Sequence, residues 1–97
     1  MSISKNDTFL EIGQNYLIRT ITMIYTGKIK AIKGDEVLLE NACWIAETTR
    51  WTDCLKACEV DADTAFNECE PYINDVIVYK GTFLDITKIS KLPTLQK

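Results

Sequence analysis

Histidine is absent from this sequence of 97 residues. Histidine is the commonest general base in enzymes, so its absence excludes Ser-His-Asp and Cys-His catalytic arrangements. The sequence also contains no nucleophile motif and no glycine-rich phosphate loop. These absences predict a protein that is not an enzyme and that carries no cofactor.

Long apolar runs are absent as well. No run approaches the roughly 18 residues that a membrane-spanning helix needs, and residues 1–8 lack the basic and apolar regions of a signal peptide. We therefore expect a cytoplasmic protein without a membrane partner. Apolar residues still make up 46% of the chain, enough to predict one folded domain.

Four cysteines are present, and the sequence favours free thiols for them. They are Cys43, Cys54, Cys58 and Cys69. The reducing cytosol disfavours disulfides. A zinc site needs closely spaced pairs of ligands, and only Cys54 and Cys58 lie close in the sequence. We therefore assign no metal ligands.

The net charge of −3 is unevenly distributed. Residues 43–72 contain seven acidic residues against two basic ones, whereas the rest of the chain has nine basic residues and seven acidic ones. An acidic chain of this kind disfavours tight, sequence-independent binding of long nucleic acids, including duplex DNA. A smaller site remains open. The lysines available for it are Lys28, Lys30, Lys33 and Lys80.

Two segments, 25–42 and 76–86, have the pattern of strands with a glycine inside them. β-Branched and aromatic residues from 16 to 26 predict a strand, a bend near Thr22 and a second strand that continues through Gly27. A turn at 33–35 leads into a third strand, which bends at Asn41. Residues 76–86 predict a strand pair, with Gly81 at a bend or at a point of close approach.

The remaining segments carry weaker signals. Residues 7–13 predict one or two helical turns, and residues 88–97 a tail that is ordered only where a neighbour covers it. A short helix is expected after Thr49 or Thr52 as the capping residue, with Trp51, Leu55 and Cys58 on one face.

The acidic segment 59–70 superficially follows the spacing of a calcium loop. Such a loop needs aspartate at its first position and glycine at its sixth, and these positions hold Glu59 and Thr64. We therefore expect a solvated acidic loop.

These elements predict a mostly β protein of one domain, folded as a small, strongly bent barrel of five strands. The domain, 1–97, divides into a lead-in (1–14), a first half (15–42), an acidic and aromatic insert (43–75), a second half (76–88) and a tail (89–97). The short helix falls in the insert.

Both halves of this barrel resemble Sm motifs. Ile18–Ala42 resembles the first motif, with Gly27 in the place of its glycine and Leu39-Glu-Asn-Ala42 at the end of its third strand. Tyr79-Lys-Gly81, continuing to Ile86, resembles the second motif. The fuller pattern, which includes Cys43-Trp-Ile-Ala-Glu-Thr48 and Glu70-Pro-Tyr72, is similar to a group of small uncharacterised Sm-like (LSm-type) proteins from bacteriophages and marine viral metagenomes.

The resemblance implies an Sm-like (SH3-type) barrel that forms a homo-oligomeric ring through its edge strands. It also implies binding of a small nucleotide or short RNA. Lys80 matches the basic residue of the uracil pocket of this family, but residues 33–37 lack the asparagine that the pocket uses. If the protein is encoded by a phage, one form of this nucleotide-binding function is an anti-defence protein in the host cytoplasm that sequesters a host nucleotide signal.

The candidate ligand-binding residues are Trp44, Thr49, Arg50, Trp51 and Lys80. Tryptophan beside arginine combines a stacking surface with a fork for phosphate or carboxylate. Large aromatic residues also concentrate at subunit contacts. The alternative is therefore a structural or protein-interaction module whose aromatic insert docks a host or virion protein.

Overall fold

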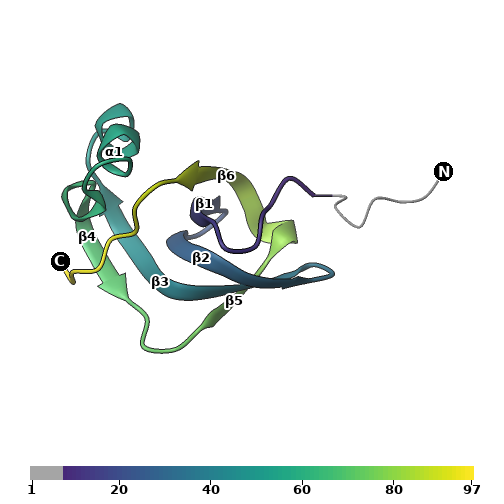
Figure 1. The fold of residues 1–97 in the computed structure, drawn as a ribbon. Helices are drawn as coiled ribbons and strands as arrows, with labels where there is room; N and C mark the ends of the chain where they lie inside the picture. The colour runs from purple at the N-terminus through teal and green to yellow at the C-terminus, as the bar shows by residue number, and fades with distance from the viewer. Residues whose placement is uncertain (1–7) are drawn as a thin grey trace.

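An antiparallel sheet of six strands dominates the computed structural model, which describes residues 8–97 (Figure 1). The strands are β1 (Asn15–Thr20), β2 (Ile24–Lys33), β3 (Glu36–Thr48), β4 (Phe66–Pro71), β5 (Val76–Tyr79) and β6 (Phe83–Ile89). One short helix, α1 (Trp51–Ala57), and two 3-10 turns, η1 (Ala62–Thr64) and η2 (Lys80–Thr82), complete the fold. The predicted mostly β class is confirmed, with one strand more than expected.

The strand order is β4-β3-β2-β1-β6, and β5 also pairs with β3. β3 is long enough for two partners, because its first part pairs with β5 and its last part with β4. Asn41 divides these parts with a φ of 52°, as predicted, since asparagine tolerates the left-handed region. No pairing joins β6 to β4 or β5 in the described part of the chain, so the sheet is not closed into a barrel.

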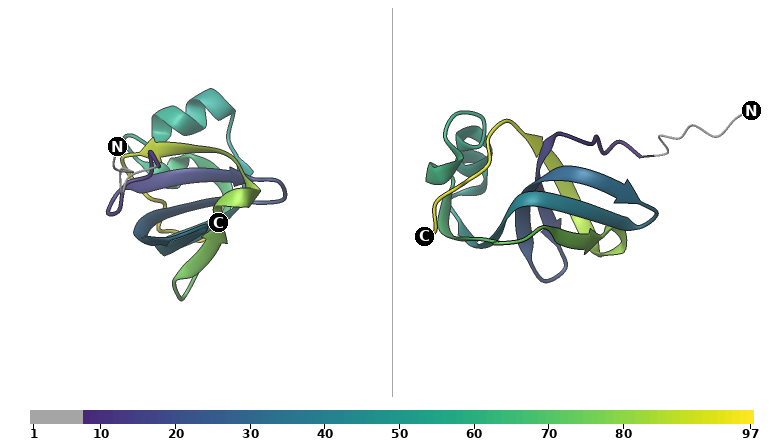
Figure 2. Two further views of the ribbon diagram at one scale, coloured as in Figure 1. Left: turned by 90° about the vertical axis from the view of Figure 1, so that its right-hand side faces the viewer. Right: turned by 60° about the horizontal axis from the view of Figure 1, so that its bottom comes forward.

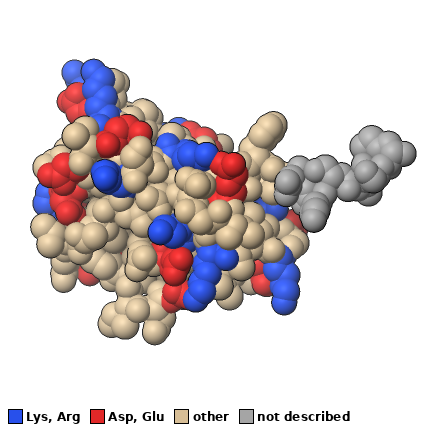
Figure 3. All heavy atoms as spheres, in the orientation of Figure 1, with Lys and Arg blue, Asp and Glu red and all other residues tan. Residues whose placement is uncertain are grey.

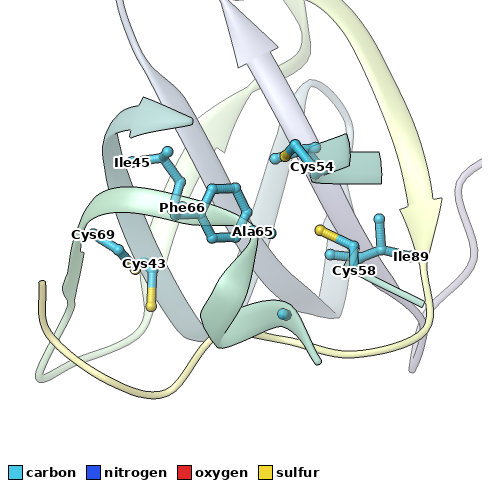
Figure 4. Close-up of a cluster of buried hydrophobic side chains, with 10 residues drawn as sticks. Cys43, Ile45, Cys54, Cys58, Ala65, Phe66, Cys69 and Ile89 are labelled. Carbon is cyan, nitrogen blue, oxygen red and sulfur yellow. The ribbon is translucent and has the colours of Figure 1, made fainter. Parts of the chain in front are cut away.

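Apolar residues pack on both faces of this sheet. β1 shows this most clearly, because Tyr16, Leu17 and Ile18 are all buried although neighbouring side chains in a strand point to opposite faces. Tyr16 and Ile18 belong to a sheet cluster with Ile29, Val37, Leu39, Ala42 and Val78. Leu17 belongs to an insert cluster with Cys43, Ile45, Cys54, Cys58, Ala62, Ala65, Phe66, Cys69 and Ile89 (Figure 4).

α1 lies over one face of the sheet (Figure 2). The insert cluster lies between this part of the insert and the sheet. α1 has only seven residues, too few for a stable helix in isolation, so packing of its apolar face stabilises it. Trp51, Leu55 and Cys58 pack against the cluster, as predicted from their spacing. The predicted cap is wrong. Arg50 precedes the helix, and the Thr49 hydroxyl instead donates a hydrogen bond of 2.9 Å to the carbonyl of Ala65.

β4 replaces part of the expected acidic loop. Phe66 and Cys69 are buried in the insert cluster, while Glu68 and Glu70 face solvent. The strand forms because the edge of β3 that faces away from β2 has no other partner after Asn41. Unpaired backbone N–H and C=O groups on this edge are satisfied by pairing with β4. The acidic residues hide this strand in the sequence, since only two of its six side chains are buried.

Residues 8–13 contain bends and a turn, so the predicted N-terminal helical turn is wrong in this range; Asp7 lies outside the described residues. Two backbone N–H groups of the segment donate hydrogen bonds to the sheet, and Glu11 also makes an ion pair with Lys88 of β6. The Gly13 N–H donates a hydrogen bond of 2.7 Å to the Ile29 carbonyl, and the Glu11 N–H donates one of 2.9 Å to the Tyr16 hydroxyl. Gly13 has a φ of 90°, which is incompatible with continuation of a right-handed helix.

The C-terminal residues are ordered by contacts within the chain, so the prediction that they need a neighbour is wrong. Cys69 and Lys97 exchange backbone hydrogen bonds of 3.0 and 2.8 Å, which pairs the tail with the outer edge of β4. The Asp63 carboxylate accepts hydrogen bonds of 2.7 and 3.0 Å from the N–H groups of Thr94 and Leu95. Asp63 therefore anchors the tail.

We expect Asp63→Ala to release this tail and to raise amide exchange at Thr94 and Leu95 by about tenfold, because each amide loses a charge-assisted hydrogen bond. The N–H of Thr94 is the main cause that lowers the pKa of Asp63. A lowered folded-state pKa stabilises the protein above about pH 4 and stops doing so as the pH falls through it. Hydrogen exchange and melting curves between pH 7 and 3 measure both effects.

Asp53→Ala is the matched control, since Asp53 is exposed on α1 and its carboxylate has no hydrogen-bond partner among the described residues. In Asp53→Ala the amides of Thr94 and Leu95 should exchange as in the wild type. The loss of stability between pH 7 and 3 should also match that of the wild type. Equal exchange of Thr94 in the wild type and in Asp63→Ala would show that the tail is held by other contacts.

Candidate functional site

The five predicted ligand-binding residues do not form one site, although Thr49, Arg50 and Trp51 are consecutive at the start of α1. Lys80 belongs to η2, where its N–H donates a hydrogen bond of 2.8 Å to the Asp35 carbonyl at the turn between β2 and β3. Thr49 and Arg50 follow the opposite end of β3, a strand of thirteen residues. A strand rises roughly 3.3 Å per residue. Lys80 therefore cannot contact a ligand held by Arg50 within one molecule, unless that ligand is long.

Trp51 is engaged within the chain. The Arg19 guanidinium lies over its ring, with the central carbon 4.7 Å from the ring centroid. Arg19 also makes a bidentate ion pair with Asp85, in which Nε donates a hydrogen bond of 2.8 Å. This hydrogen bond lowers the pKa of the Asp85 carboxyl, so the pair stays ionised. Asp85 therefore neutralises the charge of the arginine that stacks on Trp51.

The two tryptophans lie on opposite faces of the sheet. Trp51 packs against the insert cluster, to which Ile45 belongs. Trp44 precedes Ile45 in β3, and neighbouring strand residues point to opposite faces. A single stacking surface from both tryptophans, as the sequence suggested, is therefore not formed within one molecule.

Trp44 instead forms a surface depression with residues that the sequence analysis did not select. In the sheet register it lies between Tyr25 of β2 and Glu70 of β4. The depression has a volume of about 390 Å³. It is lined by Met23, Trp44, Glu70, Pro71 and Tyr72.

Tyr72 is held in place at one wall of this depression. Its N–H donates a hydrogen bond of 2.8 Å to the Ala42 carbonyl, and its ring lies 6.3 Å from that of Tyr25, at 33° between the planes. The Tyr25 hydroxyl donates to the sulfur of Met23 at 3.1 Å. Partial burial raises the pKa of the Tyr72 phenol, which keeps it neutral. The aromatic wall is thus ordered before any ligand binds.

A second depression of about 260 Å³ adjoins the first. Pro71 and Tyr72 line both, so they form a ridge between the two. The other lining residues are Asn41, Ala42, Cys43, Leu92, Pro93 and Thr94. We call the two depressions together the aromatic groove.

The charge at the aromatic groove is negative. Glu70 lines the first depression, and among residues 8–97 no lysine or arginine lines either one. Glu68 lies two residues from Glu70 in β4, and both side chains are exposed. Elsewhere acidic and basic side chains are interspersed, as on the face in Figure 3. The groove therefore combines aromatic walls with uncompensated acidic groups.

The four cysteines are buried free thiols in the insert cluster. In Figure 4 Phe66 lies between Cys43 with Cys69 and Cys54 with Cys58. Burial raises the pKa of Cys69 to about 12, and that of Cys43 is raised for the same reason. Within residues 8–97 no three histidine, cysteine, aspartate or glutamate side chains group to hold a metal ion. The thiols contribute packing rather than surface chemistry.

Comparison with protein-family models, curated proteins and solved structures found no match to this chain. In the part of the chain that the structure describes, no helix is long and apolar enough to cross a membrane.

Of the groove residues, the sequence analysis selected only Trp44. Tyr72 and Glu70 carry a signal in the sequence, since they flank Pro71 in the Glu70-Pro-Tyr72 segment that resembles the viral Sm-like group. Met23 and Tyr25 lie in the segment 18–42 that resembles the first Sm motif, but no local pattern predicts the register of β2 with β3 that places Tyr25 opposite Trp44.

Proposed function

We propose that the protein is a non-enzymatic protein-interaction module that binds an extended segment of a partner protein in the aromatic groove. The observation that carries this proposal is the pair of adjoining depressions on either side of Pro71 and Tyr72. Neighbouring side chains of one peptide fill such a pair. Aromatic residues in pockets of this kind dominate the affinity of protein interfaces.

The charges favour a protein ligand over a nucleotide. Phosphate binding needs basic side chains or free N–H groups at the site. The groove has Glu70 instead, and Arg19, which lies over the ring of the other tryptophan, is paired with Asp85. Lys80 lies at the far end of β3 from Arg50. The docking alternative from the sequence is therefore the better supported one.

Selection of a random peptide library on the purified protein tests this proposal. We expect peptides whose affinity falls by more than about tenfold in Trp44→Ala, the size of effect typical of an aromatic anchor. The matched control is the double variant Arg50→Ala/Lys80→Ala, which changes two predicted nucleotide contacts outside the groove. It should bind these peptides as the wild type does.

Two results would reject the proposal. One is a selection in which peptide binding is unaffected by Trp44→Ala. The other is tight binding of oligouridylate or of a mononucleotide that the double variant abolishes, because the ligand site would then lie at Arg50 and Lys80.

A second candidate function is an Sm-like ring that binds a short RNA between its subunits. It is favoured by the strand order, in which β1 pairs with β6, and by the free edges: within residues 8–97, β5 pairs only with β3 and β6 only with β1. Unpaired edges pair readily with another copy, and a ring brings Lys80 of one subunit near residues of the next. Native mass spectrometry should then show one closed oligomer, whereas a monomer at all concentrations argues against the ring.

A further inference from the structure

We infer that the first depression of the aromatic groove binds a cationic side chain, lysine or arginine, of the partner peptide. This inference rests on the proposed function and names the ligand chemistry of the same site. It follows from the aromatic walls, from the position of Glu70 and from the charges around the depression.

The walls suit a cation. Trp44 and Tyr72 line the depression, and the ring of Tyr25 lies 6.3 Å from that of Tyr72. The negative face of an aromatic ring attracts ammonium and guanidinium groups, with tryptophan the strongest. The protein already uses this contact at its other tryptophan, where Arg19 lies over Trp51. Trp44 has the same chemistry, but none of the described arginine and lysine residues lines its depression.

Glu70 decides between a cationic and a neutral ligand. The ion pairs among the described residues join Arg19 to Asp85, Lys30 to Asp75 and Lys88 to Glu11, so none of them neutralises Glu70. An apolar side chain in the depression would remove water from this carboxylate and offer no hydrogen bond, which is unfavourable. A cation replaces the lost water with a charge-assisted hydrogen bond.

The surrounding charge points the same way. Residues 43–72 supply four of the five residues that line the first depression, and they contain seven acidic residues and only two basic ones, Arg50 and Lys56. Arg50 lies beyond the end of β3 and Lys56 in the last turn of α1, which packs on the insert-cluster face. Trp44 lies on the opposite face. Glu70 lines the first depression and the exposed Glu68 lies two residues away in β4, so the potential at this depression favours cations over anions.

Titration of the full chain with blocked amino acids tests this inference. The probes are the Nα-acetyl methylamides of lysine, arginine, norleucine and glutamate. The readout is the indole N–H signal of Trp44 in a nitrogen–proton correlation NMR spectrum. This signal is assigned by its loss in Trp44→Phe. We expect the lysine and arginine probes to shift this signal and to bind at least about fivefold more tightly than norleucine, as one cation–π contact with a carboxylate implies. Glutamate should not bind.

Two variants separate the carboxylate from its surroundings. Glu70→Gln keeps the shape of the side chain and should weaken the lysine probe by about fivefold, without weakening norleucine. Glu68→Gln removes the same charge from the same strand outside the depression, and it should change lysine binding by less than about twofold. Equal effects of the two variants would mean that only the general acidity of the surface matters, which contradicts the inference.

Other outcomes overturn the inference without rejecting the proposed function. Norleucine binding as tightly as lysine would make the depression an apolar pocket, and a Trp44 signal that no cationic probe shifts would also reject the cation. In either case the proposed function is tested separately, by the effect of Trp44→Ala on the peptides from library selection. If their binding still requires Trp44, the groove remains the docking site; if it does not, the proposed function fails as well.

Discussion

Phe66→Ala should lower the free energy of unfolding by about 3–5 kcal/mol, the usual cost of truncating a fully buried phenylalanine. Phe66 is 0% exposed and lies between the two pairs of cysteines in the insert cluster (Figure 4). A domain of this size is stable by only about 5–15 kcal/mol, so the variant approaches the limit of folding. Urea unfolding followed by far-ultraviolet circular dichroism measures the change.

Phe9→Ala is the matched control, because Phe9 is fully exposed ahead of β1. Its effect should stay within about 0.5 kcal/mol, as for other surface substitutions. The difference between the two variants shows whether the insert folds with the sheet as one unit. If Phe66→Ala were as stable as Phe9→Ala, the insert would be a separate, loosely packed loop.

Gly27→Val should lower the free energy of unfolding by about 3 kcal/mol or more, through overpacking. A Cβ at Gly27 would lie 3.1 Å from the Cβ of Leu39, 3.2 Å from its Cδ1 and 3.4 Å from the Cβ of Ala42. Leu39 and Ala42 belong to the sheet cluster, so the two further methyl groups of valine have no free space. Thermal and urea unfolding both report the loss.

Gly81→Val separates this steric effect from a general effect of replacing glycine. A Cβ at Gly81 meets no atom within 4 Å, and its φ is not in the left-handed region. We expect a change within about 0.5 kcal/mol. Two variants of equal stability would mean that β2 does not approach β3 as closely as the structure has it.

These two glycines show how far the sequence predicts the fold. Gly27 lies inside β2, as predicted from the β-branched and aromatic residues around it. Gly81 lies between β5 and β6, which are both strands as predicted but do not pair with each other in the described part of the chain. Only the structure distinguishes their roles. Gly27 is a point of close approach, whereas Gly81 lies at a bend, in η2, with open space around it.

Local sequence patterns did not predict β4 or the ordered tail. β4 has acidic residues at exposed positions, and it forms because β3 extends past Asn41 and offers a free edge. The tail is ordered by Asp63, a contact over thirty-one residues of sequence that no local pattern contains. Tertiary contacts of this kind override local propensity.

The site was predicted only in part, for a similar reason. Trp44 was selected as part of a stacking surface with Arg50 and Trp51. Its pairing with Trp51 assumed that residues close in sequence share a surface, but alternation along β3 and the packing of α1 place them on opposite faces. Tyr72 reaches Trp44 through the pairing of β3 with β4, which the sequence did not predict.

Calorimetric titration of one library-selected peptide into the wild type, Trp44→Ala and Arg50→Ala/Lys80→Ala tests the central claim most directly. If the aromatic groove is the binding surface, affinity falls by more than about tenfold in Trp44→Ala and is unchanged in the double variant. If affinity instead survives Trp44→Ala and is lost in the double variant, the binding surface lies at Arg50 and Lys80, and the account is contradicted.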